Sequence, residues 1–111
     1  MQVMENLSSI QARITDRRSS NDHPGWDDLT VLLERAEKVD HRGELLHQRI
    51  GEHLVIEVPT DLLGDAAPGD RVQGHVRVAG PGRILAAPQA VEQGHFAVHF
   101  NTRDANDGPP A

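Results

Sequence analysis

The sequence predicts a small all-β domain: a mainly antiparallel barrel of five to six strands, with one short helix after the third strand. Two observations predict this class. Several segments alternate apolar and polar residues with the period of two that is typical of half-buried strands. Runs rich in Gly, Pro, Asp and Asn separate these segments. A chain of 111 residues is long enough for one such domain and too short for two ordinary ones.

The first part of the chain predicts two strands joined by a long loop. Residues 7–15 alternate cleanly, with Ile10 and Ile14 on the apolar side. Residues 16–28 are mostly polar and are expected to form the loop. Residues 29–39 fit a helical spacing and a strand face equally. A strand is favoured there, because both neighbouring segments look like strands and a hairpin needs no crossover.

The middle of the chain predicts a third strand and the short helix. Residues 45–58 read as one long strand, with a bulge or bend at Gly51, and Pro59 ends it. The following residues, 60–64, are expected to form a single helical turn. Thr60 or Asp61 is the expected N-cap of this turn, and Gly64 is expected to end it.

The last part of the chain predicts a fourth strand over residues 71–79, a Gly-Pro-Gly turn, and a fifth strand over residues 83–87. Residues 94–100 alternate once more and place Phe96 and Phe100 on the apolar face, where we expect both rings in the core.

The expected organisation of the chain is a single domain over residues 7–103. Residues 1–6 precede it as an N-terminal extension, and residues 104–111 are polar, rich in Pro and Gly, and expected to be a disordered tail.

Composition narrows the possible functions. The formal net charge of −6 opposes long-range attraction of nucleic acid or anionic membranes. All cations except Lys38 are arginines, whose planar guanidinium groups suit phosphate. The chain has no cysteine, so a disulfide or a thiolate metal site is excluded. No signal-peptide pattern and no membrane-length apolar run occur, so a cytoplasmic protein without membrane contact is expected.

A resemblance to a known superfamily rests on the stretch before and within the fourth expected strand. The run Pro68-Gly69-Asp70-Arg71-Val72, followed by Gly74-His75-Val76, is similar to the corresponding part of many OB-fold (oligonucleotide/oligosaccharide-binding) domains, single-strand-binding proteins among them. The order of elements over residues 7–87 resembles the same superfamily. The resemblance implies an OB-like barrel that binds ligand on strands two and three, between the first hairpin loop and the last.

The leading functional prediction is a non-enzymatic module that binds single-stranded nucleic acid weakly. Arginine forks suit phosphates, and an exposed indole ring can stack on one base. The outward positions of the fourth expected strand also include Arg71, Gln73 and His75. The residues predicted to bind are Arg13, Arg17, Arg18, Trp26, Arg77 and Arg83.

Other classes of function have different support in the sequence. A protein-interaction or homo-oligomerisation module is the alternative, which the acidic charge favours. The seven histidines predict no metal site, because the i, i+4 pair His95 and His99 lies on a strand, where the two side chains are too far apart. No catalytic residues and no cofactor are predicted, since Asp27, Asp28 and His23 share one polar loop without an orienting partner.

Overall fold

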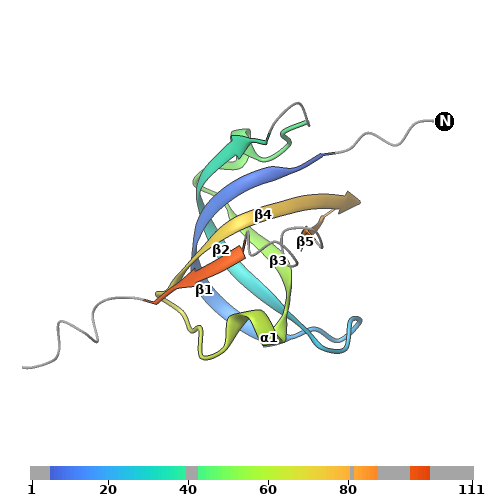
Figure 1. Cartoon of the computed structure of the whole chain (residues 1–111), viewed down its shortest axis with the longest axis vertical. Helices are drawn as coiled ribbons and strands as arrows, with labels where there is room; N and C mark the ends of the chain where they lie inside the picture. The colour runs from blue at the N-terminus through green and yellow to red at the C-terminus, as the bar shows by residue number, and fades with distance from the viewer. Residues whose placement is uncertain (1–5, 40–42, 81, 88–95, 101–111) are drawn as a thin grey trace, which may run out of the picture.

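The structure is a computed structural model of the chain that describes residues 6–39, 43–80, 82–87 and 96–100. Six strands, one 3-10 turn and one short helix follow one another (Figure 1). They are β1 (Ser8–Ser19), β2 (Trp26–Lys38), η1 (His47–Arg49), β3 (His53–Pro59), α1 (Thr60–Leu63), β4 (Arg71–Gly80), β5 (Arg83–Ala86) and β6 (Phe96–His99). The predicted all-β class and the short helix after the third strand are confirmed. The segment that fitted both helix and strand is strand β2, as favoured.

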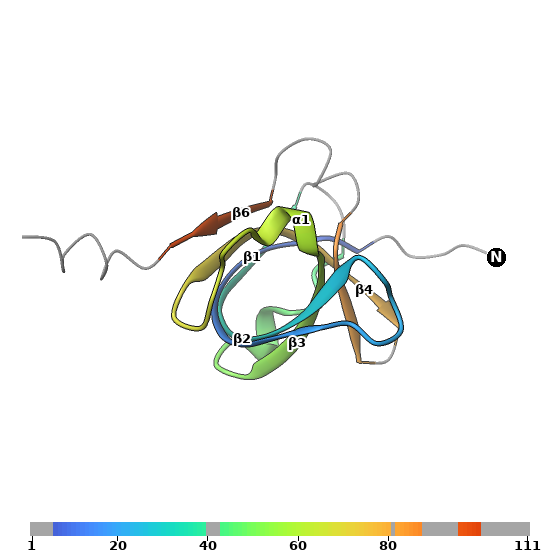
Figure 2. The same ribbon diagram turned by 90° about the horizontal axis from the view of Figure 1, so that it is seen from below.

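Five of the strands form a closed barrel. The strands follow one another around it in the order β1, β2, β3, β5, β4, and β4 pairs again with β1. Seen from below, the ribbons surround a central interior (Figure 2). All barrel pairings are antiparallel except β3 with β5, which is parallel and consists of only two residue pairs, Ile56 with Ile84 and Glu57 with Leu85. This architecture is compatible with the OB-like barrel that the sequence predicts.

The core lies inside the barrel and is almost entirely aliphatic. The inward residues of each strand alternate with exposed or half-buried ones, as the sequence pattern predicts. The largest fully buried side chains are Ile10, Ile14, Leu29, Leu33, Leu46, Ile56 and Leu63. Because these side chains fill the interior, a ligand can reach only the outer surface of the strands and the loops.

Strand β6 lies outside this closed ring. It pairs antiparallel with residues 71–74 of β4, while β5 pairs with residues 76–80 of the same strand. Because β1 also pairs with residues 71–76, β6 and β5 follow one another along the opposite edge of β4. The sheet at this end of the molecule is therefore wider than the barrel alone.

The first hairpin departs from the prediction. Strand β1 continues to Ser19 and β2 begins at Trp26, so that the loop between them covers only residues 20–25. Arg17 pairs with Leu29 and Arg18 with Asp28 in this part of the ladder. The β1–β2 ladder contains two register shifts, one after Gln11 and one after Ile14. The polar residues at the end of β1 are ladder residues at the end of the barrel rather than loop.

The expected long third strand is also wrong in its first half. A 3-10 turn, η1, precedes β3, which begins only at His53. The carboxylate of Glu44 accepts hydrogen bonds from the backbone N–H groups of Leu46 and His47, while the Leu46 side chain is buried in the core. Burial opposes ionisation of Glu44, yet these bonds and one from Ser8 hold its pKa below the usual value.

Of the two predicted caps of α1, the one at the C-terminus is confirmed and the one at the N-terminus is wrong. Gly64 follows the helix with a positive φ of 51°, as expected of the residue that ends it. Pro59 is the N-cap, and no side chain caps the helix. The hydroxyl of Thr60 donates instead to Asp27 on β2, which links α1 to the hairpin below it.

The two phenylalanine side chains lie in different environments. Phe96 is buried, whereas Phe100 is 56% exposed, so the prediction that Phe100 lies in the core is wrong. Phe100 follows the last residue of β6 and lies beyond the described pairs of β6 with β4. The predicted N-terminal extension 1–6, apart from Asn6, and the tail 104–111 lie outside the described residues and stay predictions.

Candidate functional site

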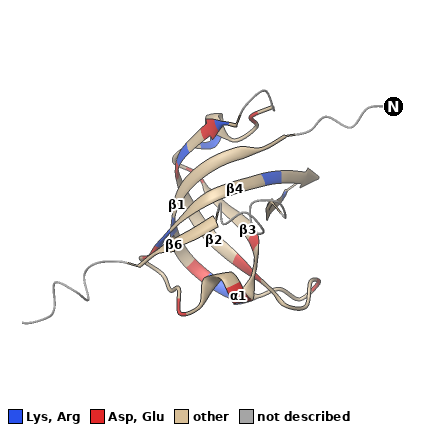
Figure 3. Ribbon diagram, in the orientation of Figure 1, with Lys and Arg blue, Asp and Glu red and all other residues tan. Residues whose placement is uncertain are grey.

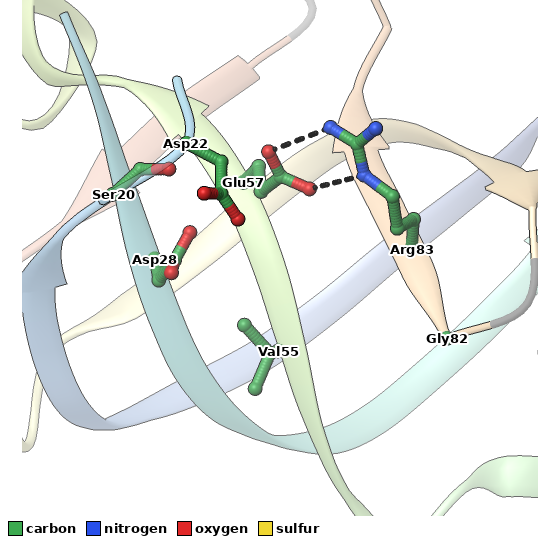
Figure 4. A pocket seen from close by; sticks show the side chains of 7 residues that line it. All are labelled: Ser20, Asp22, Asp28, Val55, Glu57, Gly82 and Arg83. Atoms are coloured by element: carbon green, nitrogen blue, oxygen red, sulfur yellow. Dashed lines mark hydrogen bonds and ion pairs between the residues drawn. The ribbon is translucent and has the colours of Figure 1, made fainter. Parts of the chain in front are cut away.

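The outer surface of the barrel is hollowed into a cleft of about 240 Å³. It lies over β2 and β3, between the loop after β1 and the turn before β5 (Figure 4). Its lining residues are Ser20, Asp22, Asp28, Val55, Glu57, Gly82 and Arg83. This is the surface on which the sequence resemblance places a ligand.

Carboxylates dominate the cleft. Arg83 donates from Nε and Nη2 to the two oxygens of Glu57, at 2.9 and 3.0 Å. This bidentate bond first, and the positive charge of Arg83 with it, hold the pKa of Glu57 below its usual value in spite of burial. Asp22 and Asp28 form no ion pair with any described residue. The cleft therefore carries a net negative charge.

The pKa of Asp28 shows the effect of the neighbouring carboxylates. Burial raises the pKa of Asp28, and the negative charges of Glu57 and Asp22 raise it further. A ligand with positive charge or hydrogen-bond donors relieves this repulsion, whereas a phosphate increases it. The cleft therefore disfavours the nucleic-acid backbone that the resemblance implies.

Trp26 is a half-buried residue beside this cleft. The imidazole ring of His23 stacks on its indole ring, with centroids 4.2 Å apart and planes 15° from parallel. Nδ1 of His23 lies 3.5 Å from the Glu57 carboxylate. The predicted stacking platform thus already holds an aromatic partner from its own loop.

Arg17, one of the predicted phosphate ligands, binds groups of its own chain. Its Nε donates to Asp27 at 2.7 Å, and its Nη1 donates to the carbonyls of Gly64 and Ala66, both at 2.8 Å. The side chain of Arg17 is 21% exposed and that of Asp27 only 8%. Burial opposes ionisation of Asp27, but the hydrogen bonds from Arg17 and Thr60 hold its pKa below the usual value.

Arg18 is the most exposed of the three predicted arginines on this side. Its side chain is 80% exposed, and its Nε donates to Asp16 at 2.8 Å. Arg17, Arg18 and Arg83 are therefore all paired with carboxylates from neighbouring strands or from the same strand. The predicted phosphate-binding loop offers no unpaired arginine among its described residues.

A second surface has the opposite charge. We call it the arginine face: the outer surface of β1 and β4 with the adjoining part of β2, carrying Arg13, Arg35, Arg71 and Arg77 (Figure 3 shows blue segments along β4). Arg13 and Arg71 lie directly opposite each other on β1 and β4. His99 on β6 lies opposite Arg71 in turn. Residues paired in this way project from the same side of a sheet, so that three basic residues form a row.

One carboxylate serves both central arginines. Glu34 accepts from Nε of Arg71 at 2.9 Å, and its other oxygen lies 3.9 Å from Nη2 of Arg13. The side chains of Arg13 and Arg71 are 46% and 41% exposed. The pair therefore retains positive charge and has guanidinium N–H groups available to a ligand.

The surroundings of this pair are polar and contain few acids. Gln11 and Gln73 form the next cross-strand pair and line a shallow depression of about 40 Å³ with Arg35 and Glu37. Arg35 lies 3.5 Å from Glu37 in an exposed ion pair. Arg77, also exposed, forms no ion pair with a described residue. Four arginines thus face two glutamates.

The structure divides the six predicted binding residues between these surfaces. Arg13 and Arg77 lie on the arginine face. Arg83 lines the cleft, and Arg17, Arg18 and Trp26 lie at the end of the first hairpin beside it; we call the cleft and this hairpin end the cleft side. The cleft centres on β3, which lies across the five-stranded ring from the β1–β4 pair, so the two surfaces point away from each other. The fourth-strand alternation had placed Arg71 outward, but only the register shows that it faces Arg13.

Comparisons with protein-family models, curated proteins and solved structures found no match to this chain. Among the described residues, no group of three or more His, Cys, Asp or Glu is arranged to hold a metal ion. No helix in the described part of the chain is long and apolar enough to cross a membrane.

Proposed function

We propose that this protein is a non-enzymatic module that binds single-stranded nucleic acid by its phosphates, on the arginine face rather than in the cleft. The observation that carries the proposal is the cross-strand pair Arg13 and Arg71, which shares the single carboxylate of Glu34. Like charges directly opposite each other destabilise a sheet unless an anion lies between them. Glu34 supplies half of the required negative charge, and a phosphate supplies the rest.

The architecture supports the ligand class. We propose that the barrel is an OB-like one, because its strand order and the short helix between β3 and β4 are those the resemblance implies. Such barrels bind oligonucleotides on strands two and three. In this chain the corresponding surface is the acidic cleft. Charge therefore favours the same class of ligand on a different face.

The chemistry of the arginine face predicts weak and sequence-tolerant binding. Guanidinium groups and the amides of Gln11 and Gln73 donate to phosphate oxygens without reading base identity. Strands β1 and β4 carry no Phe, Tyr or Trp side chain for stacking. The net charge of −6 adds repulsion at long range, which keeps the affinity low. Because salt screens the local attraction between arginines and phosphates, the affinity falls further as salt is added.

Fluorescence polarisation with a labelled single-stranded oligonucleotide tests the proposal. The affinity of the wild type should fall steeply between about 50 and 200 mM salt. In the double variant R13Q/R71Q the slope of log K against log salt should be smaller by about 1.4, because each lost phosphate contact contributes about 0.7 for single strands.

The matched control is R18Q/R49Q, which removes two exposed, ion-paired arginines outside the arginine face. This control removes the same number of positive charges and should leave the slope of log K against log salt unchanged. Equal losses in both double variants, or no binding by the wild type at the lower salt, would overturn the proposal.

The second candidate is an interaction between protein surfaces. The cleft favours it, because Asp22 and Asp28 carry unpaired charge beside Val55, which is 45% exposed. For either function we propose a cytoplasmic setting, since a chain without cysteine suits a reducing compartment.

A further inference from the structure

We infer that the cleft of one copy of this chain binds the arginine face of a second copy, so that the protein associates with itself head to tail. The two surfaces differ in the sign of their charge and lie on the same molecule. The inference goes beyond nucleic-acid binding and commits to a second copy as the occupant of the cleft.

The acidic partner in this contact is the part of the cleft that Arg83 does not neutralise. Arg83 and Glu57 satisfy each other through two hydrogen bonds. Asp28 and Asp22 remain on the wall opposite Arg83 (Figure 4). Their carboxylates repel each other, and an incoming guanidinium group removes that repulsion. The half-exposed Val55 offers an apolar surface to the aliphatic stem of the same arginine.

The basic partner is the central pair of the arginine face. Arg13 and Arg71 have one carboxylate between them, so a second carboxylate completes the charge balance. Arginine binds carboxylates through parallel N–H···O bonds, as Arg83 does with Glu57 in this chain. The contact therefore repeats, between copies, a bond type that the barrel already uses.

The position of the two surfaces dictates the form of the assembly. The cleft centres on β3, which lies across the ring from β1 and β4. One contact therefore leaves a cleft exposed at one end of the pair and an arginine face exposed at the other. Heterologous contacts of this kind extend into open chains or rings rather than stopping at a two-fold dimer.

Sedimentation velocity on the full chain tests the inference. At low ionic strength the weight-average sedimentation coefficient should rise with protein concentration and should not level off at a dimer. At about 1 M salt, where the Debye length is about 3 Å, the protein should sediment as a monomer. A wild type that remains monomeric at all concentrations in low salt, or that stops at a closed dimer, overturns the inference.

Charge exchange gives a sharper test. Asp28→Arg removes the net negative charge of the cleft, and Arg71→Glu removes the net positive charge of the arginine face and places a carboxylate at its centre, so each variant alone should sediment as a monomer. In an equimolar mixture the new carboxylate at the centre of one variant's arginine face meets the new guanidinium group in the other variant's cleft, and association should return. The controls D65R and R49E change the same charges at exposed positions outside both surfaces, and each should associate as the wild type does.

Folding of the variants is checked by circular dichroism, and R13E replaces Arg71→Glu if the latter unfolds. Association of D28R alone as strong as that of the wild type would contradict the inference, as would a mixture that stays monomeric.

Oligonucleotide binding separates this inference from the proposed function. D28R should lose self-association and keep binding to the oligonucleotide, while R71E should lose both. If the wild type binds the oligonucleotide but never associates, head-to-tail contact is wrong and the proposed function stands. If it associates without binding the oligonucleotide, the reverse holds.

Discussion

The cleft side and the arginine face use the same residue type for different ends. On the cleft side, Arg17 and Arg83 each have a carboxylate of their own, and Arg17 also donates to two backbone carbonyls. On the arginine face, Arg13 and Arg71 share Glu34. The ratio of guanidinium to carboxylate groups, rather than the number of arginines, therefore distinguishes a structural surface from one that has capacity for an anionic ligand.

This difference concerns the six predicted residues, which do not lie together on one surface. An arginine in a polar loop looks like a phosphate ligand as long as its partner is unknown. In the folded chain, Asp27 is buried beside Arg17, and the pair holds the first hairpin against the segment after α1. Removing such an arginine should affect the fold, whereas removing Arg13 should affect binding.

The largest expected effect is that of Arg17→Met. It leaves the Asp27 carboxylate buried without its cation and two carbonyls without their donor, so the free energy of unfolding should fall by about 2 kcal/mol or more. Asp27 has a lowered pKa in the folded state, so this stabilisation is present above its unfolded pKa and is lost as pH falls through the folded one. Urea unfolding should therefore show the cost at pH 7 and a smaller cost in acid.

Arg18→Met is the matched control for this prediction. The side chain of Arg18 is 80% exposed, and exposed ion pairs contribute little. We expect the free energy of unfolding to change by less than about 0.5 kcal/mol. A similar loss of unfolding free energy in both variants would mean that the contacts of Arg17 stabilise the fold no more than the exposed ion pair of Arg18.

A smaller effect of opposite sign is expected for Asp28→Asn. Burial and the neighbouring carboxylates raise the pKa of Asp28, so its charged form is less favourable in the folded protein than in the unfolded one. Removing the charge should stabilise the protein at pH 7 by about 0.5 kcal/mol. The gain should vanish once the pH is low enough for Asp28 to be protonated in both the folded and the unfolded state. A loss of stability at pH 7 would show that Asp28 is compensated in the cleft.

The smallest effect concerns Trp26, the only tryptophan in the chain. It lies beside the cleft and is stacked on His23, away from the β1–β4 pair. Oligonucleotide binding on the arginine face should leave its fluorescence nearly unchanged. Strong quenching on titration would move the nucleic-acid site to the first loop and reverse the comparison of the two surfaces.

Local patterns in the sequence were sufficient for most of the fold. Alternation fixed which side of β1, β2 and β4 is buried, and Gly64 ended the short helix where expected. The continuation of β1 through Arg17 to Ser19 was missed, because these residues have no apolar alternation and are held by pairing with β2. The turn at residues 47–49 was missed because the Glu44 carboxylate, three residues earlier, organises it.

The site was less predictable, because it depends on which strands are neighbours. Alternation along the fourth strand predicts that Arg71 points outward, but it cannot place Arg71 opposite Arg13, which lies 58 positions earlier in the chain. The bond between Arg83 and Glu57 likewise joins strands that meet only in the closed barrel. Phe100 was assigned to the core by alternation alone, although its strand ends before it.

The short parallel pairing of β3 with β5 has a consequence for the dynamics of the barrel. Only two residue pairs close the ring there, and the bond between Glu57 and Arg83 crosses the same joint. Local opening at this joint breaks fewer ladder bonds than opening between β1 and β2. Its amide protons should therefore exchange with solvent sooner than those of the first hairpin. A ligand that draws Glu57 away from Arg83 would also loosen the barrel, so occupancy of the cleft and opening of the ring are thermodynamically linked.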